Sequence, residues 1–138
     1  MIENRPVVDV VSKKWGFEKR IINNEKYCGK LLYVVKGKHT SLHYHKSKDE
    51  TFYVHSGKLK VYYQDDIKKA KESVSRGIVN PDGGDISIPL HEFESETLNA
   101  GDVFRVPAER VHRVYAVEDT QLYEFSTTHN EKDTVRLA

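Results

Sequence analysis

Hydrophobic and polar residues alternate along most of this chain in short runs, and turn residues separate the runs. Alternation of this kind is typical of strands that bury one face. The strands expected from it are 7–11, 17–22, 30–36, 40–45, 51–55, 58–63, 103–106, 121–126 and one that carries His112, Val114 and Ala116 on one face. Many short strands with little helix predict an all-β barrel or sandwich.

Residues 65–97 interrupt this pattern. Residues 66–75 have the composition of a helix with a thin apolar stripe, Pro81 to Gly84 form a turn signal, and 85–90 and 93–98 alternate like short strands. An insertion of this length is unusual in a compact barrel. It is either a surface excursion or a lid over the barrel mouth, and the sequence favours neither.

The length of 138 residues fits a single domain. The chain has 22 Lys and Arg against 21 Asp and Glu, and this balance gives no reason to expect a nucleic-acid partner. Cys28 is the one cysteine, which excludes an internal disulfide. The N-terminus lacks the apolar run of a signal peptide, and no stretch reaches the length of a membrane span. We therefore expect a cytoplasmic protein with no membrane partner.

Candidate chemistry is concentrated between Gly37 and Gly57. His43 and His45 are two residues apart, so in a strand both imidazoles point to the same face. Glu50 follows after a short polar connection, and His112 supplies a third imidazole from far along the chain. Three histidines and one carboxylate suit a divalent metal ion such as manganese, iron, zinc, cobalt or nickel.

A purely structural set of polar residues is the alternative explanation for these four side chains. Three imidazoles that meet inside a barrel are costly to bury unless something satisfies them. A metal ion satisfies them at once, so the sequence favours one divalent metal held by His43, His45, Glu50 and His112. Ligand type alone does not select the metal.

This pattern resembles the two motifs of the cupin superfamily. The first motif is matched at every position, by Gly37, His43, His45, Glu50 and Gly57. The second is matched by Gly101, Pro107 and His112, whereas Glu109 stands where the family has glycine and Ala116 where it has asparagine. The resemblance implies a single cupin barrel (a double-stranded β-helix, or jelly roll) at 15–126 with the insertion 65–97, an N-terminal arm at 1–14 and a C-terminal tail at 127–138. It also implies a homodimer.

A narrower resemblance points to sugar chemistry. Stretches near both ends and in the middle are similar to the cupin domain of type II mannose-6-phosphate isomerases, whose ending is echoed by Glu124 and by Lys132 to Arg136. In addition, His43, His45, Lys48 and Glu50 reproduce a spacing seen in cupin lyxose and mannose isomerases. The partner implied is a small molecule, a sugar or sugar phosphate.

The first functional hypothesis is therefore a metal-dependent sugar or sugar-phosphate isomerase or epimerase that works through a metal-stabilised enediolate. Glu124 is the candidate base if its strand places it inward, and otherwise it is a solvent-facing glutamate. Lys48 is the candidate partner of a developing oxyanion, and otherwise a solvated loop lysine. An iron(II) cupin dioxygenase and a non-catalytic sugar-binding cupin are the alternatives.

Other polar residues receive no role from the sequence. His39, His91 and His129 have no partner at metal-ligand spacing and are left out of the site. Lys38, Arg105 and Arg113 could each meet a phosphate or carboxylate, but taken singly each is expected to be a surface charge.

Overall fold

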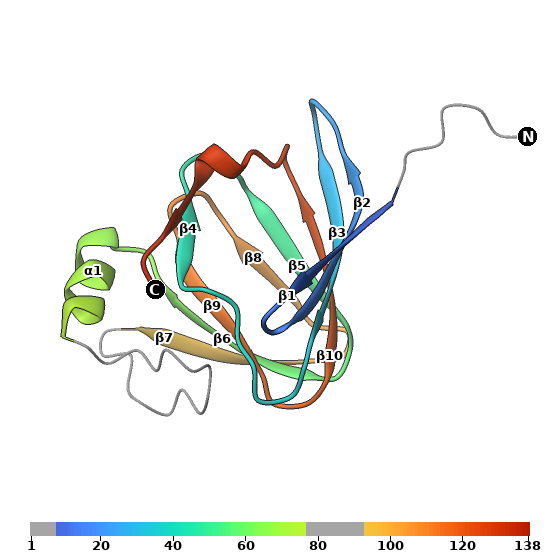
Figure 1. The fold of residues 1–138 in the computed structure, drawn as a ribbon. Coiled ribbons are helices and arrows are strands. Elements are labelled where there is room, and N and C mark those ends of the chain that lie inside the picture. Colours follow the sequence, from blue (N-terminus) through green and yellow to red (C-terminus); the bar gives the residue numbers. More distant parts are fainter. Residues whose placement is uncertain (1–7, 77–92) are drawn as a thin grey trace, which may run out of the picture.

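The computed structural model describes residues 8–76 and 93–138 (Figure 1). The strands are β1 (Asp9–Lys13), β2 (Gly16–Asn23), β3 (Cys28–Val34), β4 (His43–His45), β5 (Glu50–Ser56), β6 (Lys58–Gln64), β7 (Glu94–Asn99), β8 (Val103–Val106), β9 (Val111–Ala116), β10 (Thr120–Ser126) and β11 (Thr134–Arg136). One α-helix, α1 (Ile67–Ser75), and one short 3₁₀ helix (Glu131–Asp133) complete the described elements. The predicted all-β class is confirmed.

The strands form two antiparallel sheets that enclose the core between them (Figure 1). One sheet has the order β1-β2-β3-β10-β5-β8, and the other has the order β11-β4-β9-β6-β7. Each sheet contributes apolar side chains to the core, among them Leu32, Val54, Leu122, Leu59, Val61 and Val114. Because neighbours in each sheet come from distant parts of the sequence, residues far apart in the chain meet inside.

Strand β5 shows how the sequence pattern determines which side chains point inward. Phe52 and Val54 are 1% and 0% exposed, whereas Tyr53 and His55, which alternate with them, are exposed. Each fully buried side chain of this size contributes about 1.5 to 3 kcal/mol through the hydrophobic effect. Glu50 lies on the same inward face, so packing of the apolar residues also directs this carboxylate into the interior.

Both chain ends described here belong to the sheets. β1 pairs with β2 of the same chain, and β11 pairs with β4 in register from Thr134 opposite His45 to Arg136 opposite His43. The C-terminal segment therefore forms an edge strand directly beside the strand that carries two of the predicted metal ligands.

The insertion contains the predicted helix and one of its two predicted strands. Asp66 caps the N-terminus of α1, and its side chain accepts a hydrogen bond from the backbone N–H of Lys69. It buries Ala70 against Leu42 and Val111, in a cluster separate from the main core. Figure 1 places α1 beyond the five-stranded sheet, on the side away from β1, β2 and β3. The predicted turn at 81–84 and strand at 85–90 lie outside the described residues.

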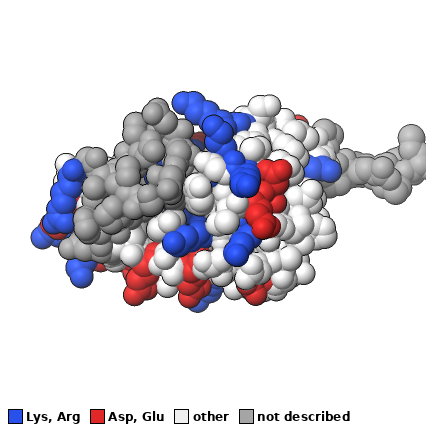
Figure 2. All heavy atoms as spheres, turned by 90° about the horizontal axis from the view of Figure 1, so that it is seen from below, with Lys and Arg blue, Asp and Glu red and all other residues white. Residues whose placement is uncertain are grey.

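The described surface carries charges of both signs. On the face in Figure 2, basic and acidic side chains are interspersed. Neither described helix is long and apolar enough to cross a lipid bilayer. Exposed apolar side chains occur along the six-stranded sheet, including Tyr27, Tyr53 and Phe125 at 54%, 38% and 55% exposure. The homodimer stays a prediction.

Gly57 closes the hairpin between β5 and β6, and we expect Gly57→Ala to destabilise the fold by about 3 kcal/mol or more. Its φ is +92°, and a Cβ there would collide with the carbonyl oxygen of Asp119 and approach the Cα of Thr120 to 2.8 Å. Gly37→Ala is the matched control, because its φ is +83° but nothing lies within 4 Å of an added Cβ. The control should lose about 1 to 2 kcal/mol, the cost of the left-handed backbone alone. Urea unfolding measures both, and equal losses would contradict the packing argument.

Candidate metal centre

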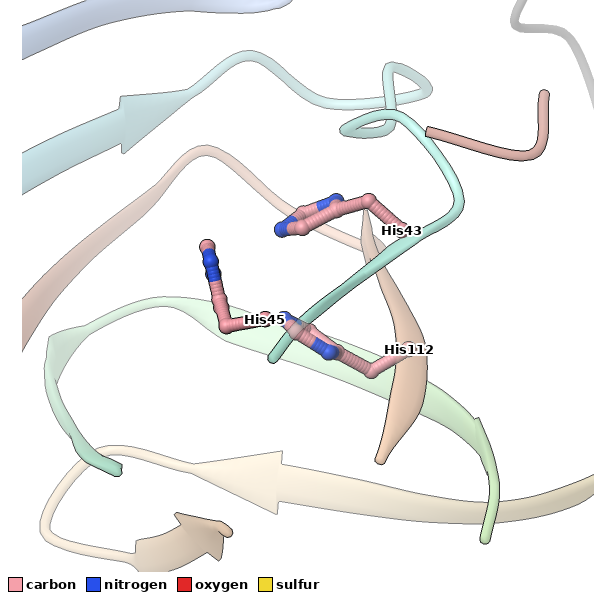
Figure 3. A group of neighbouring side chains, drawn as sticks. All are labelled: His43, His45 and His112. Atoms are coloured by element: carbon pink, nitrogen blue, oxygen red, sulfur yellow. The ribbon is translucent and has the colours of Figure 1, made fainter. Parts of the chain in front are cut away.

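Three imidazoles come together between the two sheets. His43 of β4 lies directly opposite His112 of β9 in the antiparallel register, and His45 follows two residues later on the same face of β4. Figure 3 shows the three rings turned toward one another. One ligand nitrogen from each lies within 4.8 Å of the others, close enough to share one ion. The structure thus unites the three histidines that the sequence nominated.

The outer nitrogen of each ring is already engaged. Nδ1 of His43 lies 2.9 Å from the carbonyl oxygen of Ser41, and Nδ1 of His112 lies 2.9 Å from that of Arg110. A carbonyl oxygen only accepts, so in both rings Nδ1 carries the proton and Nε2 keeps a lone pair when the ring is neutral. Nδ1 of His45 contacts the hydroxyl of Thr134 at 3.1 Å. Such outer contacts orient imidazoles for metal binding.

Glu50 lies beside two of these rings and is 2% exposed. Its Oε1 is 3.2 Å from Nε2 of His45 and 3.4 Å from Nε2 of His112, yet neither contact is aligned as a hydrogen bond within the described residues. Burial would raise the pKa of Glu50, but His112, His45 and Lys48 outweigh it and hold the pKa well below its usual value. The structure thus sets a buried carboxylate beside two imidazoles, an arrangement that a cation bound between them would stabilise.

This donor set fits a divalent metal. Burial and the neighbouring His112 and His45 hold the pKa of His43 well below its usual value, so this ring is neutral and able to bind a cation. Three imidazole nitrogens close enough to share an ion, with a carboxylate beside two of them, are the mixed nitrogen and oxygen donors that first-row divalent metals prefer.

Lys48 lies in the connection between β4 and β5, and it is buried rather than solvated. It is 3% exposed, and its Nζ lies 3.5 Å from Oε2 of Glu50. Burial would lower the pKa of Lys48, but Glu50 and Glu124 outweigh it and raise the pKa, so the side chain stays a cation. Lys48 therefore neutralises Glu50 from the side opposite the imidazoles.

Asp133 from the C-terminal segment holds this connection in place. Its Oδ1 accepts hydrogen bonds from the backbone N–H of Ser47 at 2.9 Å and from the hydroxyl of Ser47 at 2.7 Å. Its Oδ2 accepts from the backbone N–H of Lys48 at 3.0 Å. These bonds fix the loop that sets Lys48 and Glu50 relative to β4.

Glu124 faces the same interior from β10. A cavity of about 570 Å³ is lined by His43, His45, His112 and Lys48 and also by Glu124. Burial, together with repulsion from Glu50, raises the pKa of Glu124 to about 7, although Lys48 and Lys30 oppose the rise. Of the two sequence hypotheses for Glu124, the structure places it inward.

His129 lines the cavity too, although sequence reasoning assigned it no role. Its Nδ1 lies 3.2 Å from Nζ of Lys48, and its Nε2 lies 3.2 Å from Oε2 of Glu131. Burial and the cations Lys30 and Lys48 lower the pKa of His129 to about 4, so the ring is neutral at pH 7. No spacing rule could have found it, because it reaches the site through Lys48 rather than as a ligand.

Arg113 is buried, with 1% exposure, so the expectation that it is a surface charge is wrong. Strand alternation points it to the face of β9 opposite His112. Its Nε donates to the carbonyl oxygen of Thr40 at 3.0 Å. Arg105 is an exposed surface residue and pairs with Asp49 at 2.9 Å.

Comparison with known proteins identifies the family. The family model described as Cupin matches residues 29–138, which is most of the chain and includes every nominated ligand. The chain is a cupin. No curated protein matches its sequence significantly.

Solved structures share the fold of this cupin. KdgF from a Halomonas species superimposes with a TM-score of 0.63 at 15% identity, covering 95% of this chain and 94% of KdgF. CapF from Staphylococcus aureus, described as a capsular polysaccharide assembling protein, gives 0.66 at 16% identity, covering 95% of this chain and 34% of CapF. Oxalate decarboxylase from Bacillus subtilis gives 0.66 at 16% identity, covering 94% and 30%. This cupin therefore spans about a third of the latter two proteins.

We expect zinc, cobalt or nickel to stabilise the cupin, because a ligand that binds only the folded state adds about 2.7 kcal/mol at a hundredfold excess over its Kd. The gain should vanish in His112→Ala and persist in His55→Ala, since His55 is exposed on the outer face of β5. Thermal unfolding with each metal and with a chelator measures the effect. An equal response in both variants would place the metal elsewhere.

We expect Lys48→Met to destabilise the metal-free protein by about 3 to 5 kcal/mol, because it leaves the Glu50 carboxylate buried without its ammonium partner. Added metal should restore much of this loss, since the ion supplies the missing positive charge. Lys46→Met is the control, because Lys46 is exposed two residues away. Urea unfolding with and without metal tests this, and a loss unaffected by metal would show that Lys48 acts only through packing.

Proposed function

We propose that this cupin is a metal-dependent isomerase or epimerase of a sugar or sugar phosphate, similar in chemistry to type II mannose-6-phosphate isomerases and cupin lyxose and mannose isomerases. The observation that carries the proposal is the presence of two carboxylates in different environments near the three imidazoles. Glu50 lies beside two of the imidazoles, and Glu124 faces the cavity from the neighbouring strand β10 with its pKa raised to about 7.

His43, His45, His112 and Glu50 are the proposed metal ligands. A bound divalent ion would supply Lewis-acid polarisation of a substrate carbonyl and would orient a neighbouring hydroxyl. The protein itself keeps the three imidazoles together through the pairing of β4 with β9 and through the outer contacts of the ring nitrogens, and Glu50 of β5 lies beside two of them.

Glu124 is the proposed base. Moving a proton between adjacent carbons requires one group that accepts the proton and returns it, and a carboxyl whose pKa lies near 7 can do both at neutral pH. Lys48 keeps its charge in the same cavity and can stabilise negative charge that develops on a substrate oxygen. Its contact with Glu50 also positions that ligand.

Of the solved structures named above, CapF supports sugar chemistry, because its description names polysaccharide assembly. The narrower sequence resemblance supports the same class. We also propose that the protein works as a homodimer, as the resemblance implies, and that it is cytoplasmic.

A screen of aldoses and their phosphates with the metal-loaded protein in deuterium oxide tests the proposal. The expected result is interconversion of an aldose and a ketose, or of two epimers, with deuterium entering at the exchanged carbon. Oxygen consumption without isomerisation would support an iron(II) dioxygenase instead, and saturable sugar binding without exchange would support a sugar-binding protein.

We expect Glu124→Gln to lower kcat by about a hundredfold to ten-thousandfold while metal binding is retained, because the amide cannot accept the proton. In the unmodified enzyme, activity should fall as the pH drops through about 7 or slightly below, since protonation of Glu124 removes the base. Glu118→Gln is the control, because Glu118 is exposed in the turn before β10. A pH profile that is unchanged in Glu124→Gln would exclude this role.

A further inference from the structure

Two cations share a single carboxylate on the wall of the cavity. Nζ of Lys30 lies 3.2 Å from Oε1 of Glu18, and Nε of Arg20 lies 2.9 Å from Oε2 of the same glutamate. All three residues line the cavity that contains the imidazoles. Burial would raise the pKa of Glu18, but Lys30 and Arg20 outweigh it and hold the pKa below its usual value. The triad therefore carries a net positive charge.

Lys30 retains donors that the protein does not use. It is 4% exposed, and an ammonium has three N–H donors. Among the described residues, its recorded hydrogen bond is the one to Glu18. Arg20 likewise bonds Glu18 through Nε, which leaves its terminal nitrogens for other acceptors, and its side chain is 42% exposed. A buried cation with unused donors is costly unless an acceptor reaches it.

The rest of the wall reinforces this charge. Besides Arg113, which strand alternation directs to the outer face, the cavity is lined by Lys13, Lys14, Arg20, Lys30, Lys48 and Arg136. The carboxylates that line it are Glu18, Glu124 and Glu131. Even when Glu50, which lies against Lys48, is added to these carboxylates, six positive groups face four negative ones, and this excess favours an anionic ligand.

From this juxtaposition we infer that the substrate is an anionic sugar whose carboxylate or phosphate is bound by Lys30 and Arg20, with Glu18 holding the two cations in position. The inference rests on the proposed function, because it names the substrate class of the same cavity. It assigns Lys30 and Arg20 as specificity-determining residues.

The register of the sheet sets where the acid group lies in the substrate. Lys30 pairs with Glu124, and Glu124 pairs with Phe52, across the consecutive strands β3, β10 and β5. Two strand spacings separate Lys30 from Phe52 by about 10 Å. Phe52 packs against His112, with ring centroids 5.9 Å apart, so the cations lie about two strands away from the imidazoles. The acid group therefore belongs at the end of the sugar away from the oxygens that face the imidazoles.

The test is calorimetric binding to the metal-loaded protein of glucose, mannose and galactose, each as the neutral sugar, the 6-phosphate and the 6-carboxylate. At least one acid should bind roughly tenfold to hundredfold more tightly than its neutral counterpart. Preference for the 6-carboxylates would identify a uronate, and preference for the 6-phosphates a sugar phosphate. If no acid binds more tightly than its neutral counterpart, the inference is overturned.

Variants of Lys30 and Arg20 test whether these two cations cause the preference for the acid. Lys30→Met and Arg20→Gln should each remove most of the preference for the acid while leaving affinity for the neutral sugar unchanged. Lys19→Met is the matched control, because Lys19 lies in β2 between Glu18 and Arg20 and points to the opposite face. Arg20→Gln alters a partly exposed side chain, so it decides the matter even if Lys30→Met fails to fold. Equal effects of Lys19→Met and Arg20→Gln would contradict the assignment.

The binding test of this inference and the isomerisation test of the proposed function can give different results. Isomerisation of neutral sugars with no preference for acids would support the proposed function and overturn this inference. Tight binding of an acid without isomerisation would support this inference and count against the isomerase.

Discussion

The buried charge of Glu50 is the constraint on which this site depends. A carboxylate with 2% exposure cannot be hydrated, so it must be balanced by the groups around it. Lys48 balances it from one side, while His45 and His112 present nitrogens on the other side without a hydrogen bond to it among the described residues. A divalent ion bound between these nitrogens and Glu50 would complete the balance. Glu50 and the groups around it therefore form one electrostatic unit.

The C-terminal segment holds this unit together. Asp133 fixes the loop that carries Lys48, Thr134 contacts Nδ1 of His45, and His129 contacts Nζ of Lys48. All three come from a segment of six residues that ends beside β4. The tail thus sets the geometry of the loop between β4 and β5.

The sequence predicted those parts of the fold and site that depend on local periodicity. Alternation placed Phe52 and Val54 inside, and the spacing of His43 and His45 put both on one face. It could not predict contacts that depend on strands meeting from elsewhere. The burial of Lys48 follows from Glu50 and His129, and the burial of Arg113 follows from the position of Thr40.

Glu109 shows a departure from the cupin sequence motif that the backbone conformation does not share. The cupin motif has glycine there, and Glu109 has a φ of +70°, the left-handed conformation that glycine adopts without strain. The departure from the motif therefore changes the residue and keeps the turn, whose backbone N–H bonds the carbonyl oxygen of His45 at 2.7 Å. A sequence match scored by residue identity counts this position as lost, whereas the backbone preserves it.

Two nearby glutamates acquire opposite properties because their neighbours differ. Glu50 lies against Lys48 and two imidazoles and stays ionised, whereas burial and repulsion from Glu50 raise the pKa of Glu124 to about 7. Environments that drive the pKa values of two acid groups apart in this way separate the roles of the groups, one as a fixed charge and one as a proton carrier. The cations near Glu124 keep this rise moderate, and Lys30 is among them. An acid group of the proposed substrate, bound at Lys30, would offset that cation and raise the pKa of Glu124 further. The charge of the substrate would then be coupled through one lysine to the strength of the proposed base.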